Sequence, residues 1–257
     1  MFDDSSIRAL LLSFLAGMST LIGALIVFIV KQKSERLVSA SLGFAGGVML
    51  SVSFIDLLPN ANELLKEYFG YRIGIVSSMI CLILGVIIAG ALDRFVPHIK
   101  EENGEEYRHQ NLFRVGVIST IAIGLHNFPE GIATFMAGYD NLELGVSIAL
   151  AIAMHNIPEG LSVAMPIYFS SGSIGKAFKY TFLSGIAEPI GALLAFLILK
   201  PYINDFMLGA IFSLISGIMI YISLEELIPS SRQYNYTKTA LIATFLGIAI
   251  MPLTHII

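Results

Sequence analysis

Long, nearly uncharged apolar runs set the first limit on what this chain can fold into. A helix of about 20 apolar residues crosses a bilayer, and several runs here are that long. Lipid leaves backbone groups no partner except the chain itself, so a spanning segment must be a helix or a barrel strand, and barrel strands alternate in polarity. The sequence predicts an all-α polytopic membrane protein, with a single transmembrane domain over residues 1–257. Eight spans are expected, at about 6–30, 38–58, 72–95, 112–138, 143–167, 176–199, 205–228 and 238–256.

Two copies of one polar motif interrupt the middle of the fourth and fifth runs. Residues 126–131 read His-Asn-Phe-Pro-Glu-Gly, and residues 155–160 read His-Asn-Ile-Pro-Glu-Gly. Ionisable groups inside a membrane are costly, and they usually serve function. Positions i and i+4 share a helix face, so His126 lies with Glu130, and His155 lies with Glu159. Asn127 and Asn156 flank that face. Two imidazoles, two carboxylates and two amide oxygens between two helices predict a divalent-metal site.

Further candidate ligands lie in other spans. Glu188, halfway along the sixth run and next to a proline, is expected to be a ligand, because a lone carboxylate there would be neutral or absent. Met49, halfway along the second run, is a soft candidate ligand, although most methionines in apolar helices only pack. The acidic residues Asp56, Glu225 and Glu226 either attract the cation at the entrance and exit or merely cap and pack. The single cysteine, Cys81, excludes a cysteine-based zinc site.

The second and seventh runs repeat each other. Gly47, Met49, Ser53, Asp56 and Pro59 recur at one constant offset as a glycine, methionine, serine, acid and proline near the end of the seventh run. The second and seventh spans cross in opposite directions, as do the fourth and fifth. Inverted repeats around a midplane site are typical of secondary transporters. Glycines 43 and 47 are spaced for close helix packing and are given no chemical role.

Lysine and arginine predict the orientation. Eleven of the 15 fall in the connections after the first, third, fifth and seventh spans or at the span ends beside them. Because positive charge marks the cytoplasmic side, both termini are predicted outside the cytoplasm, in a multi-pass protein of the cell (inner) membrane. The longest cytoplasmic loop, 96–111, combines His98 and His109 with four glutamates. It is either a solvated linker or a weak metal-sensing loop.

These residues resemble the ZIP family of divalent-metal transporters, most closely its bacterial ZupT-type members. The resemblance covers the whole chain and implies the ZIP fold with a two-metal site. It implies that one ion is held by His126, Glu130, His155 and Glu159, with Met49 close by. The second ion would be held by Asn127, Glu130, Asn156, Glu159 and Glu188, with the carboxylates of Glu130 and Glu159 bridging. It also implies import into the cytoplasm, with spans one, four, five and six moving against the other four.

The expected function is therefore uptake of zinc, together with iron, manganese, cobalt and cadmium, as transported ions rather than cofactors. The expected partners are these ions and the lipid bilayer, with no nucleic acid, and a homodimer is a candidate assembly. An intramembrane zinc-dependent hydrolase is the alternative, since the zinc ligands exist. However, the motif is not His-Glu-x-x-His, and a hydrolase needs no duplicated motif. A metal-gated receptor without transport would want a signalling segment, which the sequence does not contain.

Overall fold

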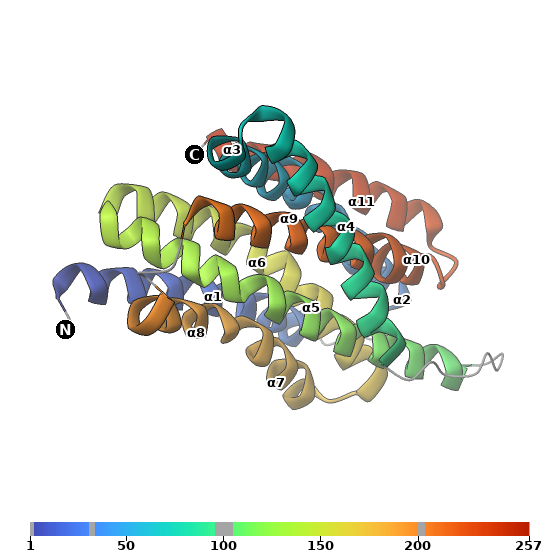
Figure 1. The fold of residues 1–257 in the computed structure, drawn as a ribbon. Helices are drawn as coiled ribbons and strands as arrows, with labels where there is room; N and C mark the ends of the chain where they lie inside the picture. Colours follow the sequence, from blue (N-terminus) through green and yellow to red (C-terminus); the bar gives the residue numbers. More distant parts are fainter. Residues whose placement is uncertain (1–2, 31–33, 96–104, 200–203, 257) are drawn as a thin grey trace.

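The computed structural model describes residues 3–30, 34–95, 105–199 and 204–256, and all of its regular structure there is helical (Figure 1). Seven helical segments in this part of the chain are long and apolar enough to cross a membrane, and Thr237–Leu253 is a shorter apolar helix. The eight predicted spans are therefore present as helical segments. They are α1 (Asp4–Val30), α2 with α3 (Glu35–Ser51, Leu58–Phe69), α4 (Tyr71–Phe95), α5 (Glu105–Asp140), α6 (Leu142–Ser171), α7 with α8 (Ile174–Gly185, Ala187–Leu194), α9 with α10 (Asp205–Ile222, Ile228–Ser231) and α11 (Thr237–Ile250).

The prediction that the second span ends near residue 58 is wrong. The chain passes through a π-helical turn, Val52–Leu57, and continues as α3 to Phe69. Pro59 therefore lies within a continuous helical segment, directly after the π-helical turn, and it cannot donate a backbone hydrogen bond to that turn. Asp56 accordingly lies inside a long helical segment rather than at its end.

The cytoplasmic loop predicted at 96–111 is also too long. Helix α5 begins at Glu105, so the loop's last seven residues form the first turns of that helix. The remainder, 96–104 with His98, lies outside the described residues, and the proposed metal-sensing role of the loop stays a prediction.

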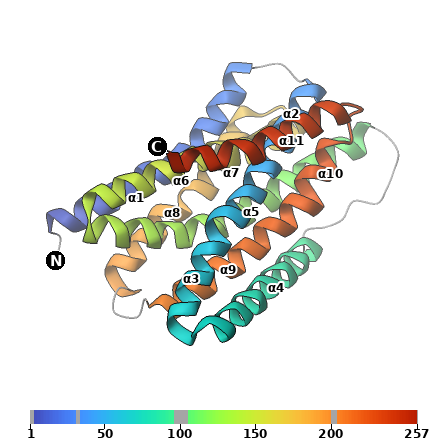
Figure 2. The same ribbon diagram turned by 90° about the horizontal axis from the view of Figure 1, so that it is seen from above.

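The helices form two bundles, each tightly packed within itself. The site bundle contains α1, α5, α6, α7 and α8, and the flanking bundle contains α2, α3, α4, α9, α10 and α11. A Cβ added at Gly131 of α5 would lie 1.8 Å from the carbonyl oxygen of Glu188, and one at Gly160 of α6 would lie 1.8 Å from that of Thr20. Such approaches leave no room for a side chain, and all those found at helical glycines in the described chain stay within one bundle. Between the bundles, α2 packs on α6, and α9 packs on α5 (Figure 2).

The repeat seen in the sequence has a matching local structure. Each of the two repeats contains a π-helical turn, Val52–Leu57 in one and Ser223–Leu227 in the other. Ser53 Oγ donates to the carbonyl of Met49 at 2.8 Å, and Ser223 Oγ donates to that of Met219 at 2.7 Å. The two repeats therefore have corresponding turns and corresponding hydrogen bonds. Helices α2 and α9 run in opposite directions, as predicted (Figure 2).

Packing glycines follow the same repeat. A Cβ at Gly47 would lie 2.1 Å from the Thr244 carbonyl oxygen on α11, and one at Gly217 would lie 2.0 Å from the Leu82 carbonyl oxygen on α4. The close-packing role predicted for Gly43 and Gly47 is thus confirmed. Outside these seams, large apolar side chains such as Leu15, Ile83 and Phe245 are exposed, as expected of a surface that faces lipid.

Candidate metal centre

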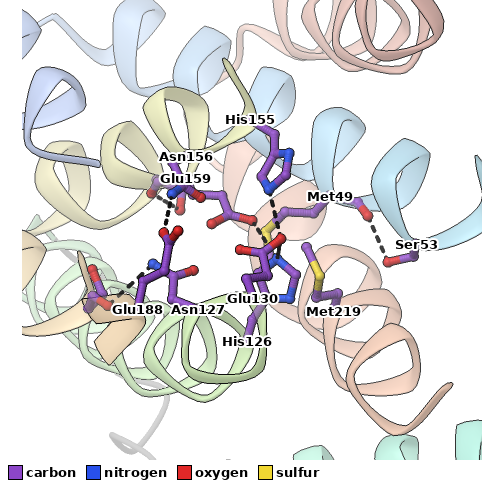
Figure 3. A network of polar contacts seen from close by, with 12 residues as sticks. Met49, Ser53, His126, Asn127, Glu130, His155, Asn156, Glu159, Glu188 and Met219 are labelled. Atoms are coloured by element: carbon purple, nitrogen blue, oxygen red, sulfur yellow. Dashed lines mark hydrogen bonds and ion pairs between the residues drawn. The ribbon is translucent and has the colours of Figure 1, made fainter. Parts of the chain in front are cut away.

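The two polar motifs face each other because α5 and α6 form an antiparallel pair. Asn141 alone separates the two helices, and its side chain accepts from the backbone N–H groups of Glu143 and Leu144 at 2.9 and 3.2 Å. This cap starts α6 directly after α5 ends. Both helices continue through the prolines of their motifs, Pro129 and Pro158. The turn therefore sets the two motifs opposite one another in the middle of the bundle (Figure 3).

Two histidines and two glutamates form the first group of ligands. One carboxylate oxygen of Glu130 lies 3.1 Å from His126 Nε2 and 2.9 Å from His155 Nε2. The Glu159 carboxylate lies 3.6 Å from His126 Nε2. One ligand atom each of His126, Glu130 and His155 lies within 4.8 Å of the other two, which is compact enough to surround one cation. All four residues are buried, and none is more than 6% exposed.

Two asparagines and a third carboxylate form an adjacent group. Asn127 Nδ2 donates to the Ser184 carbonyl at 3.3 Å, and Asn156 Nδ2 donates to the Ala16 carbonyl at 3.0 Å. Only the amide nitrogen can donate to a carbonyl, so both Oδ1 atoms are turned away from these partners and stay available as ligands. Asn156 Nδ2 also donates to one Glu188 oxygen at 2.9 Å. Glu188 reaches this position because the sixth span breaks at Ile186 and restarts as α8, with Glu188 in its first turn.

The ligand atoms of these residues are mostly unpaired. Apart from the ion-pair contacts of His126 Nε2 with Glu130 and Glu159, eight buried atoms have no hydrogen-bond partner, namely Nδ1 and Nε2 of His126, Oδ1 of Asn127 and Asn156, Oε2 of Glu130, both carboxylate oxygens of Glu159, and Oε1 of Glu188. Buried polar groups are ordinarily paired, and unpaired carboxylates in a low-dielectric interior are especially costly. The donor set of imidazole nitrogen and carboxylate or amide oxygen suits first-row divalent cations such as Zn²⁺. Divalent cations bound here would supply partners to the carboxylate and amide oxygens and to one ring nitrogen of His126.

Met49 lies beside the first group, as the sequence suggested, and a second methionine, Met219, lies beside it too (Figure 3). Both are buried, with exposed fractions of 1% and 0%. Sequence reasoning named Met49 alone, although the repeat that aligns Met49 with Met219 carried the signal. The flanking bundle thus offers thioethers to the group, while the imidazole, amide and carboxylate ligands all come from the site bundle.

The other acidic residues lie outside these two groups, although Asp56 is near enough to His155 to interact with it electrostatically. Glu225 is exposed, and Glu226 is buried and pairs with Arg114 at 3.0 Å. Asp56 is half-buried. Cys81 lies on α4, in the flanking bundle, away from the motif helices.

Comparisons with known proteins agree with this chemistry. A family model described as ZIP Zinc transporter matches residues 5–115 and 104–254. The chain is 42% identical over 262 residues to the protein named Zinc transporter ZupT of Oceanobacillus iheyensis, with 98% of each chain covered. It is 42% identical to the protein of the same name from Streptococcus mutans and 43% identical to that from Chlorobium luteolum, with 96% of each chain covered in both cases.

Proposed function

This chain belongs to the ZIP family of zinc transporters, and from that premise we propose that the residues between α5, α6 and α8 hold the transported ion during passage. As a member of this family it is a transporter that takes up divalent metal ions, with zinc as a transported substrate, and it is not an enzyme. The hydrolase alternative is therefore not favoured. The observation that carries the assignment of the site is the set of eight buried, unpaired ligand atoms on six residues of the site bundle.

Two adjacent ion positions fit this set. The first uses His126, His155, Glu130 and Glu159, with Met49 beside them. The second uses the oxygens of Asn127, Asn156, Glu130, Glu159 and Glu188. Glu130 and Glu159 have unpaired oxygens that can serve both positions, and three carboxylates would offset the charge of two divalent ions better than one or two would. Mixed nitrogen and oxygen ligands suit Fe²⁺, Mn²⁺ and Co²⁺ as well as Zn²⁺, and a thioether adds Cd²⁺. Competitive uptake of these five ions into reconstituted vesicles tests the proposed range.

The thioethers are expected to set the preference for soft ions. In Met49→Leu and Met219→Leu variants, Cd²⁺ should compete with zinc uptake several-fold more weakly than in the wild type, while competition by Mn²⁺ stays unchanged. The reason is that Cd²⁺ gains more than Mn²⁺ from a sulfur ligand. Leucine nearly conserves the methionine volume, so the core should tolerate the change.

The matched control is Met165→Leu. Met165 lies on α6 and is also a buried methionine of the hydrophobic core. Competition curves for both ions measure the effect. If competition by Cd²⁺ and by Mn²⁺ weakened equally, or if the Met165 variant showed the same shift, the thioethers would not set the preference for soft ions.

We further propose that the protein lies in the cell membrane with both termini outside the cytoplasm. The two termini lie at one end of the bundle, and the first turns of α5 and α10 lie at the other (Figure 1). Arg36, Arg94 and Lys176 lie at the helix ends of that second end, namely the start of α2, the end of α4 and the start of α7. The largely exposed helix α4 is the face on which lipid or a second copy of the chain would pack.

Thiol labelling tests this orientation. In a Cys81→Ala background, a cysteine replacing Glu143 should react with a membrane-impermeant maleimide in intact cells. A cysteine replacing the exposed Gly175, whose added Cβ would meet only Ser173 Oγ at 3.9 Å, should react only after permeabilisation. The opposite pattern would invert the proposed topology.

A further inference from the structure

A buried ion-pair network joins the two bundles at the end where α5 begins. This is the proposed cytoplasmic end, here called the inner end. Arg114, in the first turns of α5, contacts Asp93 near the end of α4 and Glu226 in the π-helical turn after α9. Its Nη1 donates to the two Glu226 carboxylate oxygens at 3.0 and 3.4 Å, and its Nη2 donates to an Asp93 carboxylate oxygen and, at 3.4 Å, to the Asp93 carbonyl. Arg114 is only 8% exposed, and Asp93 and Glu226 are similarly buried.

Among the described residues, the other buried side-chain-to-carbonyl hydrogen bonds between helices stay within one bundle, whereas this network crosses from one bundle to the other. Ser19 and Asn156 donate to carbonyls within the site bundle, at 3.2 and 3.0 Å. Ser51 donates to the Ile248 carbonyl within the flanking bundle, at 3.0 Å. The close glycine contacts also stay within one bundle, so each bundle resists internal rearrangement. Movement between the bundles is therefore easier than movement inside them.

The boundary between the bundles is important for transport because the metal ligands lie almost entirely on one side of it. The imidazole, amide and carboxylate ligands belong to the site bundle, and the flanking bundle contributes only thioethers. A cation held by one bundle can change its exposure to the two sides only if that bundle moves against the other. Such movement must break the contacts of Arg114, because its partners lie on the flanking bundle.

We propose that Arg114, Asp93 and Glu226 form an ionic clasp that holds the inner ends of the two bundles together and opens in each transport cycle. This inference rests on the proposed function. The clasp stabilises the arrangement in which the inner ends are closed. A charge-assisted contact of this kind is directional, and it is lost completely when its partners separate, so it favours two discrete states over a continuum.

A surface pair beside the clasp allows a direct test. Asn111 Nδ2 donates to Gln233 Oε1 at 3.3 Å, which joins the start of α5 to the segment after α10. In a Cys81→Ala background, Asn111→Cys with Gln233→Cys should transport zinc normally, because surface substitutions of this kind rarely disturb a fold. A short bifunctional methanethiosulfonate reagent should then link the two bundles across their inner ends.

The expected result is that cross-linked protein still binds zinc, measured by isothermal titration, but that its uptake falls to background and returns after reduction. The two single-cysteine variants, treated with the same reagent, should keep full uptake. Uptake at the uncross-linked rate in fully cross-linked protein would overturn the clasp. Absence of uptake before cross-linking would instead count against the proposed function, so the two failures are distinguishable.

A second measurement addresses the charges themselves. Arg114→Gln alone removes the cation that faces two buried carboxylates and can fail to fold, whereas Arg114→Met with Asp93→Asn and Glu226→Gln removes all three charges together. In this triple variant, built into the double-cysteine protein, the rate of cross-linking should fall, because the inner ends spend less time together. A merely structural role would leave that rate unchanged in folded protein, and an unchanged rate would overturn the proposal.

Discussion

The Glu159→Gln variant is expected to lose zinc uptake by about 100-fold or more, since even the loss of a group that only supports a metal ligand commonly costs 10–100-fold. Glu159 is fully buried, and neither of its carboxylate oxygens has a hydrogen-bond partner. Glutamine keeps the shape of the side chain and removes the charge. Radiolabelled zinc uptake into vesicles containing equal amounts of protein measures the loss.

Stability measurements separate a ligand from a structural residue. A structural glutamate would have partners, and its replacement would destabilise the fold. Here the metal-free variant should be at least as stable as the wild type, because the charge that is removed is fully buried and has no hydrogen-bond donor, and its contact with His126 is long, at 3.6 Å. Zinc should raise the melting temperature of the wild type, by the linkage between binding and folding, and should raise that of the variant much less.

The matched control is Glu143→Gln on the same helix. Glu143 is exposed in the first turn of α6, and it has no contact with the motif residues in the structure described here. Its variant should transport at the wild-type rate. Wild-type flux through Glu159→Gln, or an equal loss in both variants, would contradict the proposed site.

The Gly131→Ala variant is expected to lose both stability and uptake. The added Cβ would lie 1.8 Å from the carbonyl oxygen of Glu188 and 2.7 Å from its carbonyl carbon, so α5 and α8 must separate. Overpacking of this kind costs about 1–3 kcal/mol or more. In a chain of this length that lowers the melting temperature by roughly 2–4 °C for each kcal/mol. The separation also moves Glu188 from the ligand group, so uptake should fall further than the loss of folded protein explains.

Gly124→Ala on the same helix is the control. Its added Cβ would meet its nearest neighbour, Ser184 Cα, at 3.9 Å, which is ordinary contact. Alanine favours a helix over glycine by about 1 kcal/mol, so this variant should be as stable as the wild type or slightly more stable. Thermal unfolding and uptake of the two variants, compared side by side, check the prediction. Similar behaviour of both variants would mean that the close contact at Gly131 does not matter.

The features that a bilayer imposes were predictable from the sequence. Apolar runs must be helices in lipid, so the eight spans and their order followed directly. A costly polar motif, present twice, identified His126, Glu130, His155 and Glu159, and the structure brings these four side chains together. The repeat between the second and seventh spans was also visible in the sequence, because the same residue types recur at equivalent positions. Each copy contains a π-helical turn in the structure.

Features that depend on local register or distant contacts were not predictable. Pro59 suggested a helix end, but a π-helical turn before it let the helix continue. Pro189 marked an irregularity in the sixth run, but not the residue at which the helix breaks, Ile186, which puts Glu188 in the first turn of α8. The orientation of the Asn127 and Asn156 amides depends on carbonyls of Ser184 and Ala16, which belong to other helices. The ion pairs of Arg114 likewise join three spans that are distant in the sequence.

The central claim is that α5 and α6 hold the transported cation between their paired motifs. Diffraction from zinc-loaded crystals, measured on both sides of the zinc absorption edge, tests it most directly. The account predicts anomalous density at about 2.0–2.2 Å from the imidazole nitrogens of His126 and His155 and the carboxylates of Glu130 and Glu159, with a second peak toward Glu188. Zinc bound elsewhere on the chain, with no peak between these two helices, would contradict it.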